Sequence, residues 1–420
     1  MDKQLLKKIL LNNQERIEKQ ELVERDFSFD DLACYVLVGV RRAGKSFLLY
    51  QRMKQLIKNG KKWSEMLYLN FEDERLDSFK AEDFDSILEV HYEMYGTKPI
   101  LFLDEIQNVD GWHKFSRRIA DEKYIAYITG SNAKMLSQEV MTTLGGRYIP
   151  KDVYPFSFEE FLNAKNVDYD EFSILKTSGK SKVMNAFTDY FINGGLPETI
   201  RLTEKRDYIS SVYQKIYLGD IVSRNSIENY SGVKLLIKKV AESVMQPISY
   251  NRLQRILSSV GGKISLASII KYLDNILDSW LLFKIQNIAS NITEKESICK
   301  YYFVDNGIFS LFFIENNTGL LENLVALQLI RKFGRDSQVY YYNKNVEVDF
   351  YVPESELAIQ VSYTIKDLDT YDREVGALTK IPKVLSCKKR LLITYDEQQT
   401  ITDEFGEIEV VPVWKWLLEG

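Results

Sequence analysis

Over the first 150 residues, short apolar runs alternate with longer stretches of helical periodicity. A short apolar run between turn residues is typical of a buried strand, whereas apolar positions three and four residues apart are typical of a helix. Strands that alternate with helices favour an α/β fold with a parallel sheet and helices on both faces. The expected strands are Cys34–Gly39, Met66–Phe71, Pro99–Leu103 and Tyr124–Thr129, and the expected helices are 2–24, Phe47–Asn59 and Asp83–Tyr95.

From about residue 155 the pattern becomes mainly helical. A short helix follows Ile248–Tyr250, a Gly261–Gly262 turn comes next, and Ser265–Ile285 holds a helix and then an apolar strand. This order predicts a helix-turn-helix with a wing. Beyond residue 300 strands return: Tyr301–Asp305, Val339–Asn343, Val348–Val352, Ala358–Tyr363, Arg390–Tyr395 and Val410–Val413, with helices at Leu320–Phe333 and Asp367–Thr379.

The chain has 420 residues, enough for several domains, and we expect boundaries that give segments 1–150, 151–295 and 296–420. Composition adds little, since 45% hydrophobic and 27% charged residues are ordinary for a globular protein. The formal net charge of −5 excludes a global basic field, so nucleic-acid contact would need a local patch. Three scattered cysteines and two histidines disfavour disulfide, zinc and histidine-based chemistry. With no signal peptide and no apolar run long enough to span a bilayer, we expect a cytoplasmic protein without membrane contact.

A glycine-rich loop between the first strand and its helix matches the phosphate-binding pattern GxxxxGK[ST]. The glycines let successive backbone N–H groups point at phosphate oxygens, and the helix that follows directs its N-terminal dipole at the same place. Lys45 adds a charge for the β- and γ-phosphates, and the Ser46 hydroxyl is a Mg²⁺ ligand. The predicted ATP-binding residues are Gly39, Val40, Arg41, Arg42, Ala43, Gly44, Lys45 and Ser46.

Two carboxylates end the apolar strand Ile100–Leu103. Ligands of parallel α/β sheets bind at the carboxyl ends of the strands, so Asp104 and Glu105 should lie beside the loop. We expect Asp104 to hold Mg²⁺, directly or through water, and Glu105 to orient and polarise the attacking water. An apolar run ending in Asp-Glu also occurs where the carboxylates only cap the next helix.

Two further segments offer accessory groups. Thr129–Asn132 follows the next strand, and Asn132, with Ser131 second, is our candidate for contact with the γ-phosphate or water; Asn132 as a cap of a helix at Ala133–Leu136 is an equal alternative. Arg147 after Gly145–Gly146 is a candidate arginine finger, often supplied by a neighbouring subunit, and the alternative is a surface ion pair.

Together with the string Tyr154–Phe161 and with Asn193–Pro197, Tyr217–Ile221, Val304–Gly307 and Val346–Phe350, these motifs resemble the AAA+ ATPases of the prokaryotic AAA_14/DUF4143 family, related to archaeal-type ATPases. The resemblance covers nearly the whole chain, with the DUF4143 region at about 190–370. It implies an α/β protein with a P-loop AAA+ core, a helical and winged-helix middle, and a C-terminal restriction-endonuclease-like domain.

The nuclease-like domain departs from the pattern that such enzymes use. Asp349, with Glu322 on the preceding helix, stands where metal-binding carboxylates belong, but the next strand has Gln360 and Ser362 in place of Glu-x-Lys. Metal catalysis needs ligand charge and a positioned base, so we expect no nuclease activity. Lys344 or Lys366 could take the place of the missing lysine, but their spacing in the sequence does not support this. The alternative role of Glu322, Glu347 and Asp349 is in solvated faces or ion pairs.

The winged helix is a candidate nucleic-acid or protein interface. Lys271 and Tyr272 lie on the expected recognition helix, and Arg252, Arg255 and Lys263 lie just before it, where they could contact phosphates. Neighbouring Leu273, Ile276 and Leu277 are expected in the core.

The sequence thus predicts a Mg²⁺-dependent AAA+ ATPase that moves its attached domains, within a homo-oligomer or on DNA or RNA. The runner-up is an ATP-binding regulatory or scaffold protein with little turnover that acts through protein partners, and the third hypothesis is an ATP-fuelled nuclease.

Overall fold

The computed structural model describes residues 1–131, 135, 142–261, 264–335 and 338–419. The chain divides into two compact units, Met1–Tyr154 and Pro155–Gly420. No helix among these residues is long and apolar enough to cross a membrane. The first unit contains α1 (Lys3–Lys19), β1 (Cys34–Val38), α2 (Lys45–Lys58), β2 (Met66–Asn70), α3 (Phe84–Tyr95), β3 (Ile100–Asp104), α4 (Trp112–Asp121), β4 (Ala126–Gly130) and β5 (Tyr148–Asp152).

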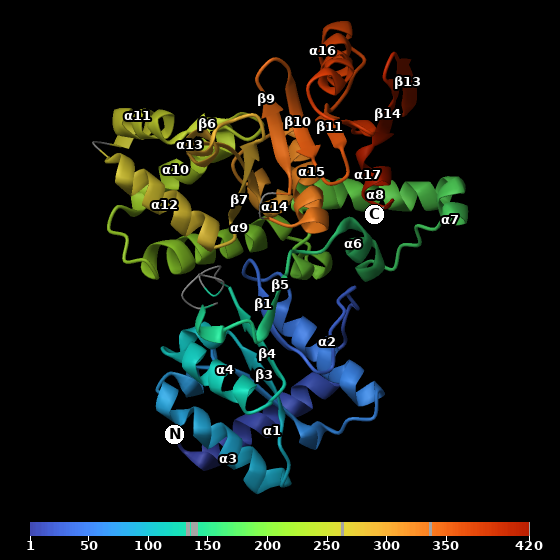
Figure 1. Ribbon diagram of the computed structural model, residues 1–420. Helices are drawn as coiled ribbons and strands as arrows, with labels where there is room; N and C mark the ends of the chain where they lie inside the picture. Colours follow the sequence, from blue (N-terminus) through green and yellow to red (C-terminus); the bar gives the residue numbers. More distant parts are fainter. Residues whose placement is uncertain (132–134, 136–141, 262–263, 336–337, 420) are drawn as a thin grey trace. The chain divides into compact units, whose positions relative to one another are not determined.

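The first unit is built on a five-stranded sheet in the order β2-β3-β4-β1-β5, and every neighbouring pair is parallel. Its central strands are buried throughout, as expected for a sheet that helices cover on both faces. Figure 1 shows α2 on one side of these strands and α4 on the other. The order brings the carboxyl ends of β1 and β3 to one edge, with only β4 between them.

The second unit contains α6 (Phe158–Ala164), α7 (Glu171–Leu175), α8 (Thr177–Asn193), α9 (Lys205–Lys215), a π-helical turn (Ile216–Ser223), α10 (Tyr230–Glu242), β6 (Ile248–Ser249), α11 (Tyr250–Gly261), α12 (Leu266–Asp278), β7 (Leu282–Asn287), α13 (Ile292–Ser297), β8 (Ile298–Phe303), α14 (Asn306–Ser310), α15 (Asn317–Phe333), β9 (Tyr340–Asn343), β10 (Glu347–Val352), β11 (Leu357–Val361), α16 (Leu368–Lys380), β12 (Lys389–Thr394), β13 (Gln399–Asp403), β14 (Gly406–Pro412) and α17 (Val413–Trp416).

These strands form one mixed sheet of nine, in the order β13-β14-β12-β11-β10-β9-β7-β8-β6. The boundary expected near residue 295 lies in the connection between β7 and β8, which are antiparallel neighbours in this sheet. The middle and C-terminal segments therefore share a sheet and lie in one compact unit. The α/β class expected from the sequence is confirmed in both units.

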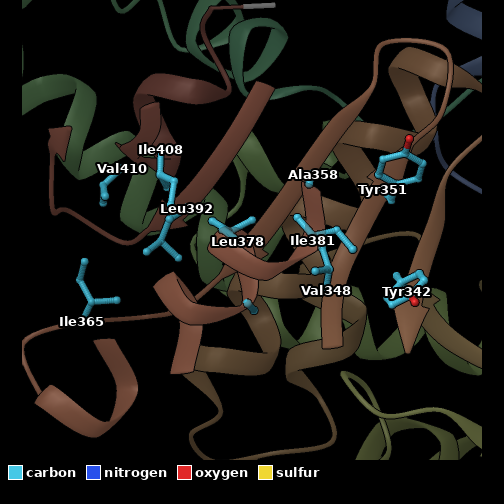
Figure 2. Packing of buried hydrophobic residues seen from close by; sticks show 11 residues of the cluster. Tyr342, Val348, Tyr351, Ala358, Ile365, Leu378, Ile381, Leu392, Ile408 and Val410 are labelled. Atoms are coloured by element: carbon cyan, nitrogen blue, oxygen red, sulfur yellow. The ribbon is translucent and has the colours of Figure 1, made fainter. Parts of the chain in front are cut away.

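One face of the C-terminal part of this sheet packs against α16 (Figure 2). Side chains of β10, β11, β12 and β14 form one buried hydrophobic cluster there with Leu378 and Ile381. Val348 and Tyr351 share this face although they are three positions apart in the sequence, because β10 shifts register between them. An irregularity of this kind redirects the intervening side chains, and one of them is Asp349. The cluster comprises Tyr342, Val348, Tyr351, Ala358, Ile365, Ala377, Leu378, Ile381, Leu392, Ile408 and Val410.

Candidate nucleotide-binding site

The glycine-rich loop leaves β1 and turns into α2 through two residues with left-handed backbone. Arg42 has φ 66° and Gly44, the N-cap of α2, has φ 93°. Glycine adopts such angles at no steric cost. The turn presents the unpaired N–H groups of the first turn of α2 at the carboxyl edge of the sheet, which is where a helix attracts a phosphate.

Lys45 lies inside this loop and is only 4% exposed. Its ammonium donates to the carbonyls of Gly39 (3.1 Å) and Val40 (3.2 Å) and lies 3.6 Å from Oε1 of Glu105. The structure therefore brings together the loop after β1 and the acidic pair at the end of β3, as the sequence predicts. A phosphate in the loop would compete with these oxygens for the ammonium.

Asp104 is fully buried at the end of β3. The Tyr68 hydroxyl donates to its Oδ2 at 2.7 Å, and the hydroxyls of Thr129 and Ser46 also donate to this carboxylate. Burial, followed by the charge of Glu105, raises the pKa of Asp104, against the effect of the three donors.

These groups fit a magnesium ion. Mg²⁺ prefers oxygen ligands and is usually held by one or two carboxylates together with phosphate oxygens and water. Asp104 supplies a carboxylate, and Ser46 is close enough to donate a hydrogen bond to it. A dication would also favour the ionised form of Asp104.

Glu105 is held in place through both its backbone and its side chain. Its backbone is left-handed (φ 51°, ψ 42°), and its N–H donates to Oγ1 of Thr129 at 2.9 Å. Gln107 Nε2 donates to Oε2 at 2.6 Å. Although burial disfavours its charge, Lys45 and the Gln107 hydrogen bond lower the pKa of Glu105 below its usual value. Glu105 is thus ionised at neutral pH, as a group that accepts a proton from water must be.

The remaining predicted site residues occupy different positions. Arg41 donates to Glu72 Oε1 at 2.6 Å, whereas Arg42 is exposed. Ser131 is fully buried just beyond β4, while Asn132 lies outside the described residues.

Arg147 lies at the amino ends of the strands, whereas the loop lies at their carboxyl ends. It precedes β5, which pairs in parallel with β1 so that Tyr148 lies opposite Cys34. Its Nε donates to Asp121 Oδ1 at 2.6 Å, and its side chain also donates to the carbonyl of Leu144. From the amino ends Arg147 cannot reach the phosphate loop of its own chain, so a role as a finger requires a second copy.

Three residues that the sequence reasoning missed support the acidic pair: Tyr68, Thr129 and Gln107. Thr129 bridges the side chain of Asp104 and the backbone of Glu105, and Gln107 binds Glu105. Thr129 ends a predicted strand at the ligand-binding edge, which was a usable signal. The contact of Tyr68 with Asp104 could not be predicted from the sequence, because it depends on β2 lying next to β3.

In the second unit, the nuclease-like carboxylates meet a lysine that the sequence reasoning missed. Lys300 on β8 is fully buried, and its ammonium lies 3.3 Å from Oε1 of Glu322 and 3.1 Å from Oδ1 of Asp349. The Tyr302 hydroxyl donates to Glu322 at 2.7 Å. Although burial opposes its charge, the two carboxylates raise the pKa of Lys300. We call Lys300, Tyr302, Glu322 and Asp349 the Lys300 cluster.

Gln360 and Ser362, the strand residues found in place of Glu-x-Lys, also form hydrogen bonds within the protein. The Gln360 side chain accepts from the Asp349 N–H at 2.7 Å and donates to Glu374, while Ser362 donates to the Thr364 carbonyl at 2.9 Å. Within the described ranges, no group of three or more His, Cys, Asp or Glu side chains is placed to hold a metal ion. The Lys300 ammonium lies where a cation would bind, so these residues do not fit a nuclease metal.

The expected recognition helix corresponds to α12. Lys271, Arg252 and Arg255 are exposed, Tyr272 is half-buried, and Lys263 lies outside the described residues. Leu273 and Ile276 are buried, as expected, whereas Leu277 is partly exposed.

A five-stranded parallel sheet with the phosphate loop after β1 and the Asp-Glu pair after β3 defines a P-loop protein of the AAA+ type. A family model described as an AAA domain (AAA_14) matches residues 33–162. In place of the expected DUF4143 region, a model described as a domain of unknown function (DUF8612) matches residues 184–318.

Two relatives align with most or all of the chain. An uncharacterized protein of Methanocaldococcus jannaschii is 34% identical over 100% of this chain and 96% of its own. An uncharacterized protein of Haemophilus influenzae is 32% identical over 91% of this chain and 94% of its own. Among solved structures, the Walker-type ATPase PABY2304 of Pyrococcus abyssi aligns with 70% of this chain and 99% of its own, at 14% identity and with a TM-score of 0.43. The chain belongs to the family of these two relatives, and its own first unit has an AAA+ ATPase-like core.

Proposed function

We propose that the protein binds ATP and hydrolyses it with Mg²⁺ in the cytoplasm. The observation that supports this most is the convergence of Lys45 and Glu105, 3.6 Å apart, beside the buried Asp104. In this arrangement a cation for phosphates, a carboxylate for a metal and an ionised carboxylate for water share one edge of a sheet.

Each group has a distinct role in this proposal. The loop N–H groups and Lys45 would bind the phosphates, and Ser46 and Asp104 would hold Mg²⁺, whose charge would offset that of the phosphates. Glu105 orients the attacking water and accepts its proton, a role that suits its lowered pKa. Since Lys45 and Gln107 both hold Glu105, phosphate binding that draws Lys45 away would leave this carboxylate freer to engage water.

The test is nucleotide binding and turnover by Lys45→Ala and Glu105→Gln. Lys45→Ala should lose most binding, whereas Glu105→Gln should bind ATP and lose turnover by about 10²-fold or more, the scale of general acid–base catalysis. Lys58→Ala, at the exposed far end of the same helix, is the matched control and should behave as the wild type. Unchanged turnover in both site variants would overturn the assignment.

We propose further that hydrolysis moves the second unit and that the nucleotide site is completed by another copy. The position of Arg147 supports this, because Arg147 could act as an arginine finger only at the nucleotide site of a neighbouring subunit. Arg147→Ala should lower turnover without changing ATP binding, and the mass in solution should rise with ATP. A chain that stays monomeric at full activity would contradict the oligomer.

A nucleic-acid partner is the next proposal. Helices α10, α11 and α12 with β6, β7 and β8 follow the order of a winged helix, and exposed Lys271, Arg252 and Arg255 could contact phosphates. Replacing all three with Glu should abolish salt-dependent binding to DNA or RNA duplexes. Wild-type protein that shows no binding at low salt would exclude this role.

The alternative function is an ATP-binding regulatory or scaffold protein with little turnover that acts through protein partners. The hydrogen bond from Gln107 and the ion pair with Lys45 favour this alternative, because a carboxylate with these partners is less available to water. Wild-type turnover equal to that of Glu105→Gln would support this alternative. Nuclease activity is disfavoured because the Lys300 ammonium occupies the expected metal position.

A further inference from the structure

The phosphate loop is packed directly against the residues at which the first unit ends. Val153 donates its N–H to the carbonyl of Val38, the residue before the loop, at 2.7 Å. A Cβ added to Gly39 would lie 1.9 Å from the Val153 carbonyl oxygen. Gly39 is therefore required for this close approach, independently of any role with phosphate.

A second contact joins the middle of the loop to the last residue of the unit. Arg25 donates through Nη1 to the carbonyl of Ala43 and through Nη2 to the carbonyl of Tyr154, both at 3.0 Å. A planar guanidinium offers two such donors in one rigid group, which the ammonium of a lysine does not. The guanidinium lies 5.3 Å from the centre of the Phe27 ring.

The backbone of Arg25 is fixed as well. Its N–H donates to Oε1 of Gln51 at 2.9 Å, and Nε2 of Gln51 donates back to its carbonyl at 2.8 Å. Gln51 lies on α2, the helix that begins at the loop. Arg25 is thus held to α2 by its backbone and bridges two carbonyls by its side chain, an arrangement suited to relaying small movements.

The chain beyond Tyr154 is held in the same manner within the second unit. Arg331 donates to the carbonyls of Pro155 (2.9 Å) and Phe156 (3.0 Å), and the Phe156 N–H donates to the Gly195 carbonyl at 2.7 Å. An arginine therefore holds backbone carbonyls on each side of the covalent junction Tyr154–Pro155, so displacement at Tyr154 would pass on to an anchored segment.

We propose that Arg25 is a positioning residue that transmits the nucleotide state of the phosphate loop to the Tyr154–Pro155 junction. The inference rests on the proposed function, since it requires ATP in the loop. Nucleotide binding that rearranges the loop backbone would shift the Ala43 carbonyl, and the shared guanidinium would carry the shift to Tyr154.

The experiment is hydrogen exchange of the full-length chain, with and without Mg²⁺ and a non-hydrolysable ATP analogue. Two peptides are followed, one over the loop at 39–46 and one over the junction at 150–158. In the wild type both should change, the junction by about fivefold, the lower end of usual couplings between sites. In Arg25→Met the loop should still respond while the junction does not.

Two variants keep the outcome decisive. Arg25→Lys keeps the charge but loses the two-pronged fork, so it should also lose the junction response; it decides the matter if Arg25→Met does not fold. Arg52→Met removes another buried guanidinium of the same unit, which binds Tyr127 and Asp31 instead, and should keep both responses.

The possible failures are distinguishable. If the loop of the wild type is not protected by the nucleotide, the proposed function falls and the inference falls with it. If the loop is protected and the junction responds equally in the wild type and both Arg25 variants, only the inference is overturned. Loss of the junction response in Arg52→Met as well would assign the effect to general destabilisation and equally overturn the role of Arg25.

Discussion

Replacing Lys300 tests whether the nuclease-like part of the second unit is held together by an internal cation. Lys300→Met keeps a chain of similar length and removes the ammonium between Glu322 and Asp349. Both carboxylates are nearly buried, at 3% and 9% exposed, so water cannot solvate the charges that the ammonium would leave unpaired. The variant should therefore be strongly destabilised.

The expected magnitude follows from the distances. At the effective dielectric constant of about 20 that suits protein interiors, each attraction across the 3.1 Å and 3.3 Å contacts is worth about 5 kcal/mol before desolvation. Removing one partner of a buried pair costs about 3–5 kcal/mol in measured cases. We expect a loss of this size in the unfolding free energy of the second unit.

The loss should depend on pH. Burial raises the pKa of Glu322 to about 7 even with Lys300 beside it, and without the ammonium this pKa should rise further. A carboxyl whose folded pKa exceeds its unfolded value stabilises the fold at low pH and loses that contribution as pH rises through the folded value. The penalty of Lys300→Met should thus be larger at pH 8 than at pH 6.

The assay is hydrogen exchange of the slowest amides of β8 and β10, since a chain of two units need not unfold in one step. Lys284→Met is the matched control: Lys284 lies on the neighbouring strand and pairs with the exposed Glu296 at 2.9 Å, a contact worth less than about 1 kcal/mol. The triple variant Lys300→Met, Glu322→Gln, Asp349→Asn should recover most of the loss, because no charge is left unpaired. A Lys300→Met penalty no larger than the control, or a triple variant as unstable as the single, would refute the reasoning.

Three further predictions concern single substitutions. Tyr68→Phe removes a donor that lowers the pKa of Asp104, so more Mg²⁺ should be needed for ATP turnover, most of all at acidic pH; an unchanged Mg²⁺ titration at pH 6 would contradict this. Gly39→Ala should abolish nucleotide binding and destabilise the first unit, because its Cβ would lie 1.9 Å from the Val153 carbonyl oxygen; wild-type melting and binding would disprove that contact. Gly376→Ala places a Cβ in open space on α16 and should stabilise this helix by about 0.5–1 kcal/mol, measurable as slower exchange of its amides, whereas faster exchange would count against the packing described.

The sequence was sufficient for features whose physics is local. The loop, its flanking strand and helix, and the acidic pair after β3 are contiguous patterns, and each was found at the predicted place. Most strands and helices of both units lie within a few residues of their expected bounds. The polar edge strand β13 was missed, because its exposed residues offer no apolar run and only its pairing with β14 makes it a strand.

Contacts set by sheet order could not be predicted. Lys300 meets Glu322 and Asp349 across 22 and 49 residues of sequence, and a lysine within a strand gives no sign of burial. The bridge from Arg25 to Tyr154 spans 129 residues. The pairing of β7 with β8, on either side of the boundary expected near 295, likewise cannot be deduced from the composition of either strand.

ATP turnover by the Glu105→Gln variant, measured beside its ATP affinity, tests the central claim most directly. The account predicts wild-type hydrolysis that requires Mg²⁺, together with a variant that binds ATP about as tightly and turns it over about 10²-fold or more slowly. Equal turnover in wild type and variant, both binding ATP, would contradict the assignment of Glu105 and leave a nucleotide-binding protein without this catalytic centre.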